Sequence, residues 1–157
     1  MQADRSQTRS LKIQTAVCRP ERGPGGIGVA VAGVGPTVAG RIYEQAYGAE
    51  DELMYRAVLR ALELGKRLGV ESVSVLCPND TIARQINRAI PVPQQGRLPM
   101  LYVKVKALMY TFRHAEVVSV PDGKVRAAHK LALAASRIPV PVRQEPRTLF
   151  TLDPAGA

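Results

Sequence analysis

Residues 55–75, YRAVLRALELGKRLGVESVSV, combine a helical pattern with a strand pattern, and this pair indicates a fold of mixed helices and strands. The acidic run 50–52 lies just ahead, where negative charge favours the helix dipole, and Gly69 predicts the end of the helix. Residues 71–77, ESVSVLC, then predict a short strand. Apolar residues at three- and four-residue spacing give the helix one buried face: Ala57, Val58, Ala61, Leu62, Gly65 and Leu68.

Three strands are predicted on the N-terminal side of this helix. They cover residues 11–18, 27–33 and 37–46. The Gly/Pro cluster of residues 19–26 predicts a turn between the first two strands, and GVGP at 33–36 predicts the next turn. Strands joined by such short turns form an antiparallel meander.

Helices and one further strand are predicted on the C-terminal side. They are a helix near 81–89, a Pro/Gly loop at 90–99, a helix whose apolar stripe runs from Leu98 to Phe112, a strand at 115–120 and a last helix at about 124–137. The order is therefore strand–strand–strand–helix–strand–helix–helix–strand–helix. It predicts an α/β fold with a mixed five-stranded sheet, in which the later strands are added through helical crossovers.

The length of 157 residues fits one compact domain. We expect a flexible N-terminus over residues 1–10, a folded domain over 11–137 and a Pro-rich tail over 138–157. No apolar run approaches the roughly 20 residues of a membrane helix, and MQADRSQTRS lacks the apolar core of a signal peptide. We therefore expect a cytoplasmic protein that does not bind membranes.

The positive charge is concentrated in the second half of the chain. The formal net charge is +9. Residues 84–157 carry 12 Lys and Arg against 4 Asp and Glu, whereas residues 1–83 carry 10 against 9. Such a basic half favours a polyanionic partner such as nucleic acid. A basic composition that serves solubility alone is the competing interpretation.

Four stretches of the sequence, in the correct order, resemble the type 1 ribonuclease H family. GPGGIGVAV resembles the glycine-rich turn and second strand of that family, and YRAVLRALELGKRLGVESVSV its first helix and fourth strand. TIARQI resembles the short helix that follows, and FRHAEVVSVPDGKVRAAHKLA the fifth strand, loop and final helix. The resemblance covers roughly residues 11–136. It implies the ribonuclease H fold, with helices on both faces of the sheet.

The resemblance also implies a site of four carboxylates around two divalent cations, but none of the matching positions is acidic. The first-strand Asp corresponds to Thr15, the Glu of the first helix to Met54, the Asp after the fourth strand to Pro78, and the Asp of the last helix to His129. These side chains cannot replace the oxygen ligands that Mg²⁺ requires. We expect the four positions to converge and to form no catalytic site.

Neighbouring residues do not restore a metal site in the sequence. Glu52 and Asp80 each lie two residues from the family position, and Asp122 is expected in the loop before the last helix. His129 has only His114, placed at the end of a helix, and two cysteines as companions for zinc. We therefore expect no metal and no cofactor. Cys18 and Cys77 are expected at the ends of neighbouring strands, as buried thiols or as a redox pair.

The basic residues of the second half supply candidates for nucleic-acid contact. Lys106, Tyr110 and Arg113 are spaced to share the polar side of the long helix, where cations suit phosphates and a ring suits a sugar or base. In the family, the glycine-rich turn, here including Gly25 and Gly26, approaches the RNA strand. The alternatives are a solvated helix face and an ordinary turn. Further basic candidates are Arg84, Arg88, Lys124, Arg126 and Lys130.

The sequence thus predicts a non-catalytic ribonuclease H-like protein that binds nucleic acid, either an RNA–DNA hybrid or duplex RNA. The alternative is a protein-interaction scaffold or homodimer built on the same fold.

Overall fold

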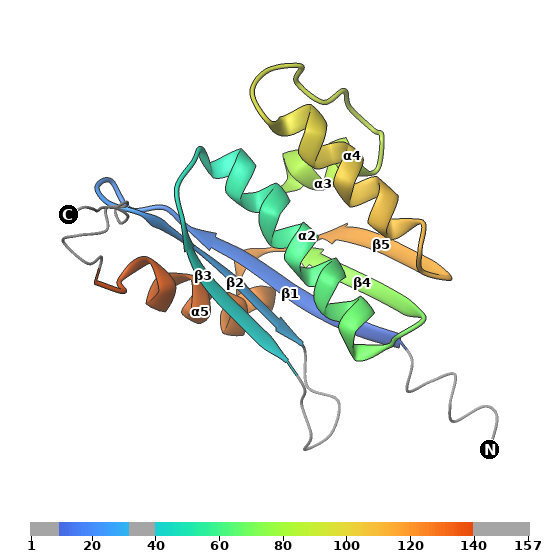
Figure 1. The fold of residues 1–157 in the computed structure, drawn as a ribbon, viewed down its shortest axis with the longest axis horizontal. Coiled ribbons are helices and arrows are strands. Elements are labelled where there is room, and N and C mark those ends of the chain that lie inside the picture. Colours follow the sequence, from blue (N-terminus) through green and yellow to red (C-terminus); the bar gives the residue numbers. More distant parts are fainter. Residues whose placement is uncertain (1–9, 32–39, 140–157) are drawn as a thin grey trace, which may run out of the picture.

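The computed structural model describes residues 10–31 and 40–139. The predicted element order is confirmed, with one short 3₁₀ helix added before the last helix (Figure 1). Most of the predicted N-terminal segment 1–10, the GVGP turn and almost all of the predicted tail 138–157 lie outside the described residues. The elements are β1 Ser10–Cys18, β2 Gly25–Val31, β3 Arg41–Ala46, α2 Glu50–Leu68, β4 Ser72–Cys77, α3 Asp80–Ile86, α4 Leu98–Met109, β5 His114–Ser119, η1 Asp122–Val125 and α5 Arg126–Ser136.

The five strands form one mixed sheet in the order β3-β2-β1-β4-β5. The first three strands pair antiparallel, as predicted, whereas β4 is parallel to both β1 and β5. The carboxyl ends of β1, β4 and β5 therefore lie along one edge of the sheet. Such an edge is where ligands bind in many α/β proteins.

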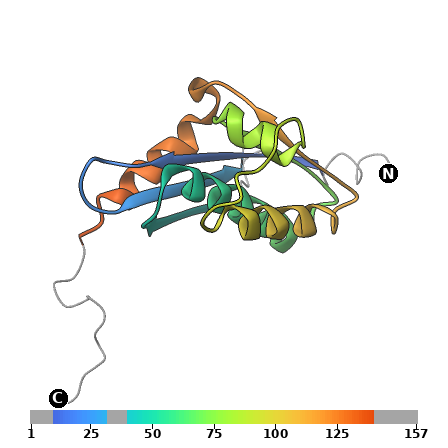
Figure 2. The same cartoon turned by 90° about the horizontal axis from the view of Figure 1, so that it is seen from above.

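Helices cover both faces of the sheet, as the resemblance implied. Figure 2 shows α5 on one side of the strands and α2 with α4 on the other. The α2 face holds the larger core, in which Ile13, Leu53 and Leu62 are fully buried. The α5 face holds a smaller cluster that includes Ala16, Ala30, Val125, Ala128 and Ala132.

Helix α2 follows its sequence pattern closely. It begins with the acidic residues 50–52 and ends at the left-handed Gly69, whose φ is 76° and whose N–H donates to the carbonyl of Lys66. Glycine adopts this conformation without the steric cost that a Cβ imposes. In α3, the Asn79 side chain accepts a hydrogen bond from the Ile82 N–H at 3.0 Å and caps the helix.

The predicted glycine-rich turn was wrong at its C-terminal end, because β2 begins at Gly25 and not at Ile27. Gly25 and Gly26 are buried strand residues. A Cβ at Gly26 would overlap the carbonyl oxygen of Ala132, and a Cβ at Gly28 would overlap that of Ala128. These glycines therefore let the backbone of α5 lie directly against β2.

Two predicted helix ends were also wrong. Helix α3 ends at Ile86, and α4 ends at Met109, so Phe112 is not helical. Phe112 is nevertheless buried, and its ring lies beside Gly65 on α2. The apolar pattern therefore continued past the helix because the following turn also packs on the core. His114 was expected at the end of a helix but is the first residue of β5.

Candidate nucleic-acid interface

A pocket of about 490 Å³ opens at the sheet edge where β1, β4 and β5 end. Residues from the end of β1, the turn after β4, the start of α2, η1 and α5 line it. The lining residues are Ala16, Val17, Glu50, Met54, Pro78, Asn79, Asp122, Gly123, Val125, Arg126, His129 and Lys130. We call this the carboxyl-edge pocket.

Three of the four positions predicted to converge do so in this pocket. Met54, Pro78 and His129 all line it, although they come from α2, the turn after β4 and α5. Thr15 does not line it, so the predicted convergence was wrong for this residue. The Thr15 side chain is fully buried, and its hydroxyl donates to the Leu76 carbonyl at 2.7 Å, which ties β1 to β4.

The side chains at this edge do not fit a pair of divalent cations. Met54 is almost completely buried and belongs to the apolar core. Glu50 and Asp122 are the carboxylates that line the pocket, and both are exposed. Within residues 10–31 and 40–139, no three His, Cys, Asp or Glu side chains lie close enough together to hold a metal ion. Mg²⁺ sites are built from carboxylates and other oxygen ligands, and this pocket does not gather them.

Basic side chains of α5 form one wall of the pocket. Arg126, His129 and Lys130 are exposed and line it, and Lys124 lies beside them in η1. Among the described residues, none of these four side chains forms a hydrogen bond or an ion pair. The charges of Lys124, Arg126 and Lys130 are therefore available to a ligand. Two exposed carboxylates on the same rim make the pocket mixed in charge instead of uniformly positive.

The other basic candidates do not form one continuous stripe. Because α4 ends at Met109, Tyr110 is its C-cap and Arg113 lies beyond the helix, where its N–H donates to the Glu71 carbonyl at 2.9 Å. Arg113 therefore precedes β5, at the opposite end of that strand from the carboxyl-edge pocket. A six-residue strand spans roughly 17 Å. One phosphate of a duplex therefore cannot contact both Arg113 and the carboxyl-edge pocket.

The Lys106 side chain already forms a hydrogen bond within the fold. Its ammonium donates to the Ile86 carbonyl at 3.0 Å, which joins α4 to the end of α3. Burial, with a contribution from nearby Arg88, lowers the pKa of Lys106 below its usual value. Arg84 is exposed and lies 3.8 Å from Asp80, one helical turn away. Arg84, Arg88 and Lys106 thus form a second basic group, which lies around α3 and α4.

The two cysteines are free thiols in neighbouring strands, as expected from the sequence. Cys77 is buried, and burial raises its pKa to about 11. Cys18 is half-buried and contacts the Ser136 hydroxyl at 3.6 Å. They belong to different sides of the sheet, since Cys77 is part of the α2 core and Cys18 packs against the α5 cluster.

Sequence reasoning missed six residues that line the carboxyl-edge pocket. They are the apolar Ala16, Val17 and Val125 together with Glu50, Asn79 and Gly123. Asn79 directly follows the parallel strand β4, so the rule that ligands bind beyond the carboxyl ends of parallel strands could have found it. None of the helices in the described residues has the length and apolar character that a membrane crossing requires.

Known proteins resemble this chain in sequence pattern and in structure. The family model described as reverse transcriptase-like matches residues 15–135. No curated protein matches the sequence.

Solved structures show the same fold at low sequence identity. Ribonuclease H1 from the archaeon Halobacterium salinarum is 16% identical, with a TM-score of 0.73 over 80% of this chain and 96% of that one. The N-terminal ribonuclease H domain of a Mycobacterium tuberculosis protein is 23% identical, with a TM-score of 0.74 over 81% of this chain and 98% of that one. The LC11 ribonuclease H1, solved with an RNA/DNA hybrid, is 21% identical, with a TM-score of 0.72 over 80% and 96%.

Proposed function

Because the chain belongs to the reverse transcriptase-like family and has the ribonuclease H fold, we propose that it is a non-catalytic domain that binds nucleic acid. One observation carries the non-catalytic part. The resemblance places the four metal-binding carboxylates at Thr15, Met54, Pro78 and His129, and none of these side chains supplies a carboxylate oxygen. Glu50 and Asp122 remain at the pocket, but two exposed carboxylates do not replace a four-carboxylate site for two cations.

The basic residues around the pocket support the binding part. Lys124, Arg126 and Lys130 are exposed and have no ion-pair partner among the described residues. Cations of this kind hold phosphates and set the register of a duplex, without reading its sequence. The LC11 ribonuclease H1 was solved with an RNA/DNA hybrid, which makes a hybrid, together with duplex RNA, the first ligand to test.

The proposed binding depends on charge and therefore on salt. Each phosphate neutralised by a lysine or arginine releases counterions, so affinity falls as salt rises. Most of the affinity comes from the phosphate backbone, so sequence preference is weak. Gly25 and Gly26 are buried beneath α5 and Leu53, and we assign them to packing instead of to nucleic-acid contact.

Fluorescence anisotropy tests the proposal. Labelled RNA–DNA hybrid, duplex RNA, duplex DNA and single-stranded RNA are titrated at two salt concentrations, with and without Mg²⁺, and the products are run on a denaturing gel. We expect salt-sensitive binding of the hybrid or duplex RNA, with every strand intact. Absent or salt-independent binding would contradict the binding part of the proposal.

Matched charge variants locate the interface. The double variant Arg126→Gln/Lys130→Gln removes two charges at the pocket, and Arg67→Gln/Arg113→Gln removes two exposed charges at the opposite end of the strands. We expect the first pair to weaken duplex binding by about tenfold and to flatten the salt dependence, and the second to have little effect. Equal effects would mean that net charge alone drives binding.

Metal-dependent cleavage would contradict the non-catalytic part. Cleavage above a contaminant control that disappears in Glu50→Gln/Asp122→Asn would show that the two remaining carboxylates form a working site. Cleavage that the double variant retains would indicate a contaminating nuclease.

A second candidate function, a protein-interaction scaffold or homodimer, is favoured by one face of α4. Met100, Val103 and Tyr110 are 55%, 62% and 76% exposed. Met100 and Val103 share one side of α4, and Tyr110 follows at the C-cap of the same helix. Contiguous exposed apolar residues often mark a protein contact. Sedimentation over a range of concentrations tests it, and self-association abolished by Met100→Ser/Val103→Ser would support this function.

A further inference from the structure

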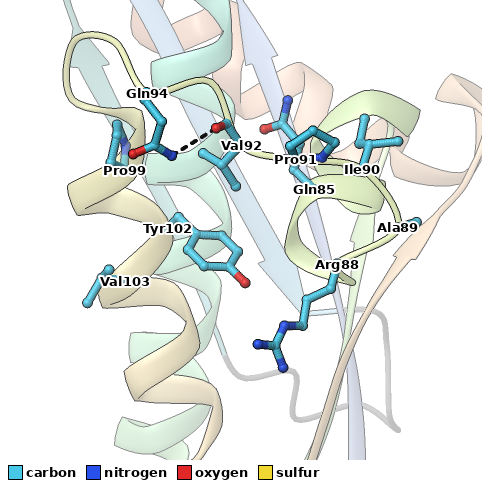
Figure 3. A pocket seen from close by; sticks show the side chains of 10 residues that line it. All are labelled: Gln85, Arg88, Ala89, Ile90, Pro91, Val92, Gln94, Pro99, Tyr102 and Val103. Carbon is cyan, nitrogen blue, oxygen red and sulfur yellow. Dashed lines mark hydrogen bonds between the residues drawn. The ribbon is translucent and has the colours of Figure 1, made fainter.

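A second pocket, of about 470 Å³, lies between α3, α4 and the segment that joins them (Figure 3). It shares no lining residue with the carboxyl-edge pocket. Pro91, Val92 and Pro99 contribute apolar wall, while Gln85, Arg88 and Tyr102 contribute polar groups. We call it the interhelical pocket.

Gln85 provides this pocket with a buried hydrogen-bond donor. Its side chain is only 3% exposed, and its Oε1 accepts a hydrogen bond from the Tyr55 hydroxyl at 2.8 Å. Burial raises the pKa of Tyr55, so the phenol stays protonated and remains the donor. This bond fixes the orientation of the amide. Within the described part of the chain, the Gln85 Nε2 group has no acceptor, and a buried unsatisfied donor is costly.

Tyr102 and Arg88 project into the space between α4 and α3 from opposite sides (Figure 3). Arg88 has a φ of 66°, which is uncommon for a residue with a Cβ. Strained positions of this kind persist where the surrounding structure holds them, and they cluster at binding sites. The half-buried Tyr102 offers one face of its ring to the pocket.

The charges beside the pocket favour an anion. Arg88 lies close enough to Lys106 to lower the pKa of that lysine. Neither cation has a carboxylate partner among the residues that the structure describes, and no Asp or Glu lines the pocket. A ligand that completes this site needs a negative group for Arg88, a flat or apolar body for Tyr102 and an acceptor for Gln85.

We propose that the interhelical pocket binds a single unpaired nucleotide, with its base against Tyr102, a base carbonyl accepting from Gln85 Nε2, and its phosphate on Arg88. Bases stack on aromatic side chains irrespective of sequence, whereas the amide adds selectivity. Because the Tyr55 hydroxyl already donates to the Gln85 oxygen, the groups of this amide that have no partner among the described residues are its Nε2 donors. The amide therefore prefers the carbonyl edge of uracil to the amino edge of adenine. A neutral peptide would leave Arg88 and Lys106 without an anion.

This inference rests on the proposed function only in taking the ligand to be a nucleotide. The nucleotide comes either from a strand end or from the free pool, and two probes distinguish these sources. The first is a labelled duplex that is blunt or carries a short 3′ overhang of uridines or adenosines. The second is free UMP or AMP, titrated while amide NMR shifts are recorded for the segment 85–103.

We expect the uridine overhang to improve affinity by about tenfold over the blunt duplex, and more than the adenosine overhang does. Tyr102→Leu and Arg88→Asn should each bring the ratio of overhang affinity to blunt-duplex affinity close to one. Asparagine is chosen at position 88 because it tolerates the positive φ of Arg88. Gln85→Met should keep an overhang preference but lose the preference of uridine over adenosine. Thermal unfolding shows whether the buried Gln85 variant folds, and the exposed Arg88 variant tests the proposal independently.

The outcomes separate this proposal from the proposed function. An overhang ratio near one in the unaltered protein, with salt-sensitive blunt-duplex binding intact and no UMP shifts, would overturn the pocket alone. Shifts with UMP but no overhang effect would support the pocket and identify the free nucleotide as its ligand. If these residues respond only to self-association, a protein occupant replaces the nucleotide and the proposal is overturned. Loss of all nucleic-acid and nucleotide binding overturns both.

Discussion

The two faces of the sheet are covered in different ways. On the α2 face, large side chains such as Leu53, Leu62 and Tyr55 fill a thick layer between helix and strands. On the α5 face, alanines of the helix meet Gly26 and Gly28 of β2, so that the two backbones nearly touch.

We call the α2 side of the sheet the thick face and the α5 side the thin face, and the two contribute differently to stability and to the candidate site. The α2 face gains stability from buried apolar volume, which is roughly proportional to the area removed from water. The α5 face holds a smaller buried cluster, and the close approach of Gly26 and Gly28 to the α5 backbone constrains where this helix lies on the sheet. His129 and Lys130 on α5 line the carboxyl-edge pocket. The thin face therefore positions the basic wall of the pocket, while the thick face holds most of the core and also supplies Glu50 and Met54 to the pocket.

The largest expected effect is on the thick face. Leu62→Ala removes a fully buried side chain from the core between α2 and the sheet, and it should lower the free energy of unfolding by about 4 kcal/mol. Urea unfolding followed by circular dichroism measures this. Leu68→Ala, at a more exposed position on the same helix, is the control. A smaller loss of stability than that of the variant Gly28→Ala, described next, would contradict the assignment of the main stabilising core to the α2 face.

Adding a side-chain atom, instead of removing several, tests the thin face. Gly28→Ala adds one methyl group that overlaps the Ala128 carbonyl, and α5 has to move, at a cost of about 3 kcal/mol. Gly123→Ala is the matched control, since a Cβ there meets no atom within 4 Å. If Gly28→Ala is as stable as the control, α5 does not depend on the close approach. We also expect weakened duplex binding, because the pocket wall shifts.

The dependence of the unfolding free energy on alkaline pH tests the burial of Cys77 in the core of the thick face. Burial raises the folded-state pKa of this thiol to about 11 from an ordinary value of 9.0. A raised pKa means that the thiol stabilises the fold fully below pH 9 and that this contribution is lost as the pH rises through 11. The loss should amount to roughly 2 kcal/mol. Unfolding free energies of the unaltered protein and of Cys77→Val, measured from pH 8 to 11, should diverge, and parallel curves would contradict the assignment.

The smallest expected effect concerns Thr15, which shares its side of β1 with the thick core. Thr15→Val keeps the shape but removes the hydroxyl that donates to the Leu76 carbonyl. We expect a loss of about 1 kcal/mol, because a buried acceptor loses its donor. Thr111→Val removes an exposed hydroxyl bonded to the Leu108 carbonyl and should cost less. Equal losses would mean that burial does not strengthen the Thr15 contact.

Much of the fold could be predicted because it is locally encoded. The apolar spacing of 57–68, the acidic start and Gly69 predicted α2 to within a residue or two. The start of β2 could not be predicted this way. Gly25 and Gly26 resemble a turn in sequence, but Gly26 is required by a helix about a hundred residues later in the chain. The end of α4 was missed because Phe112 continues the apolar pattern after the helix has stopped.

The candidate site was predictable only in part. The alignment implied by the family resemblance correctly predicted that Met54, Pro78 and His129 lie together at one pocket. It also predicted Thr15 there, but the Thr15 side chain is fully buried and does not line the pocket. The long-helix stripe of Lys106, Tyr110 and Arg113 was wrong because its spacing assumed a helix that ends four residues before Arg113. The interhelical pocket had no sequence signal, because Gln85 and Tyr102 meet only when α4 folds back on α3.

Residue type and local spacing were enough to predict the order of the elements, the helical crossover into the parallel part of the sheet and the basic second half of the chain. Through the family resemblance they also led to the expectation that four metal-ligand positions hold no carboxylate. Each of these depends on residue type or on spacing within a few residues. The three-dimensional fold was needed to learn which strand ends share an edge, which charged side chains lack partners among the described residues and which glycines contact a helix. Those features depend on pairing and packing between segments far apart in the chain, where a shift of one residue moves a side chain to the other face of the sheet.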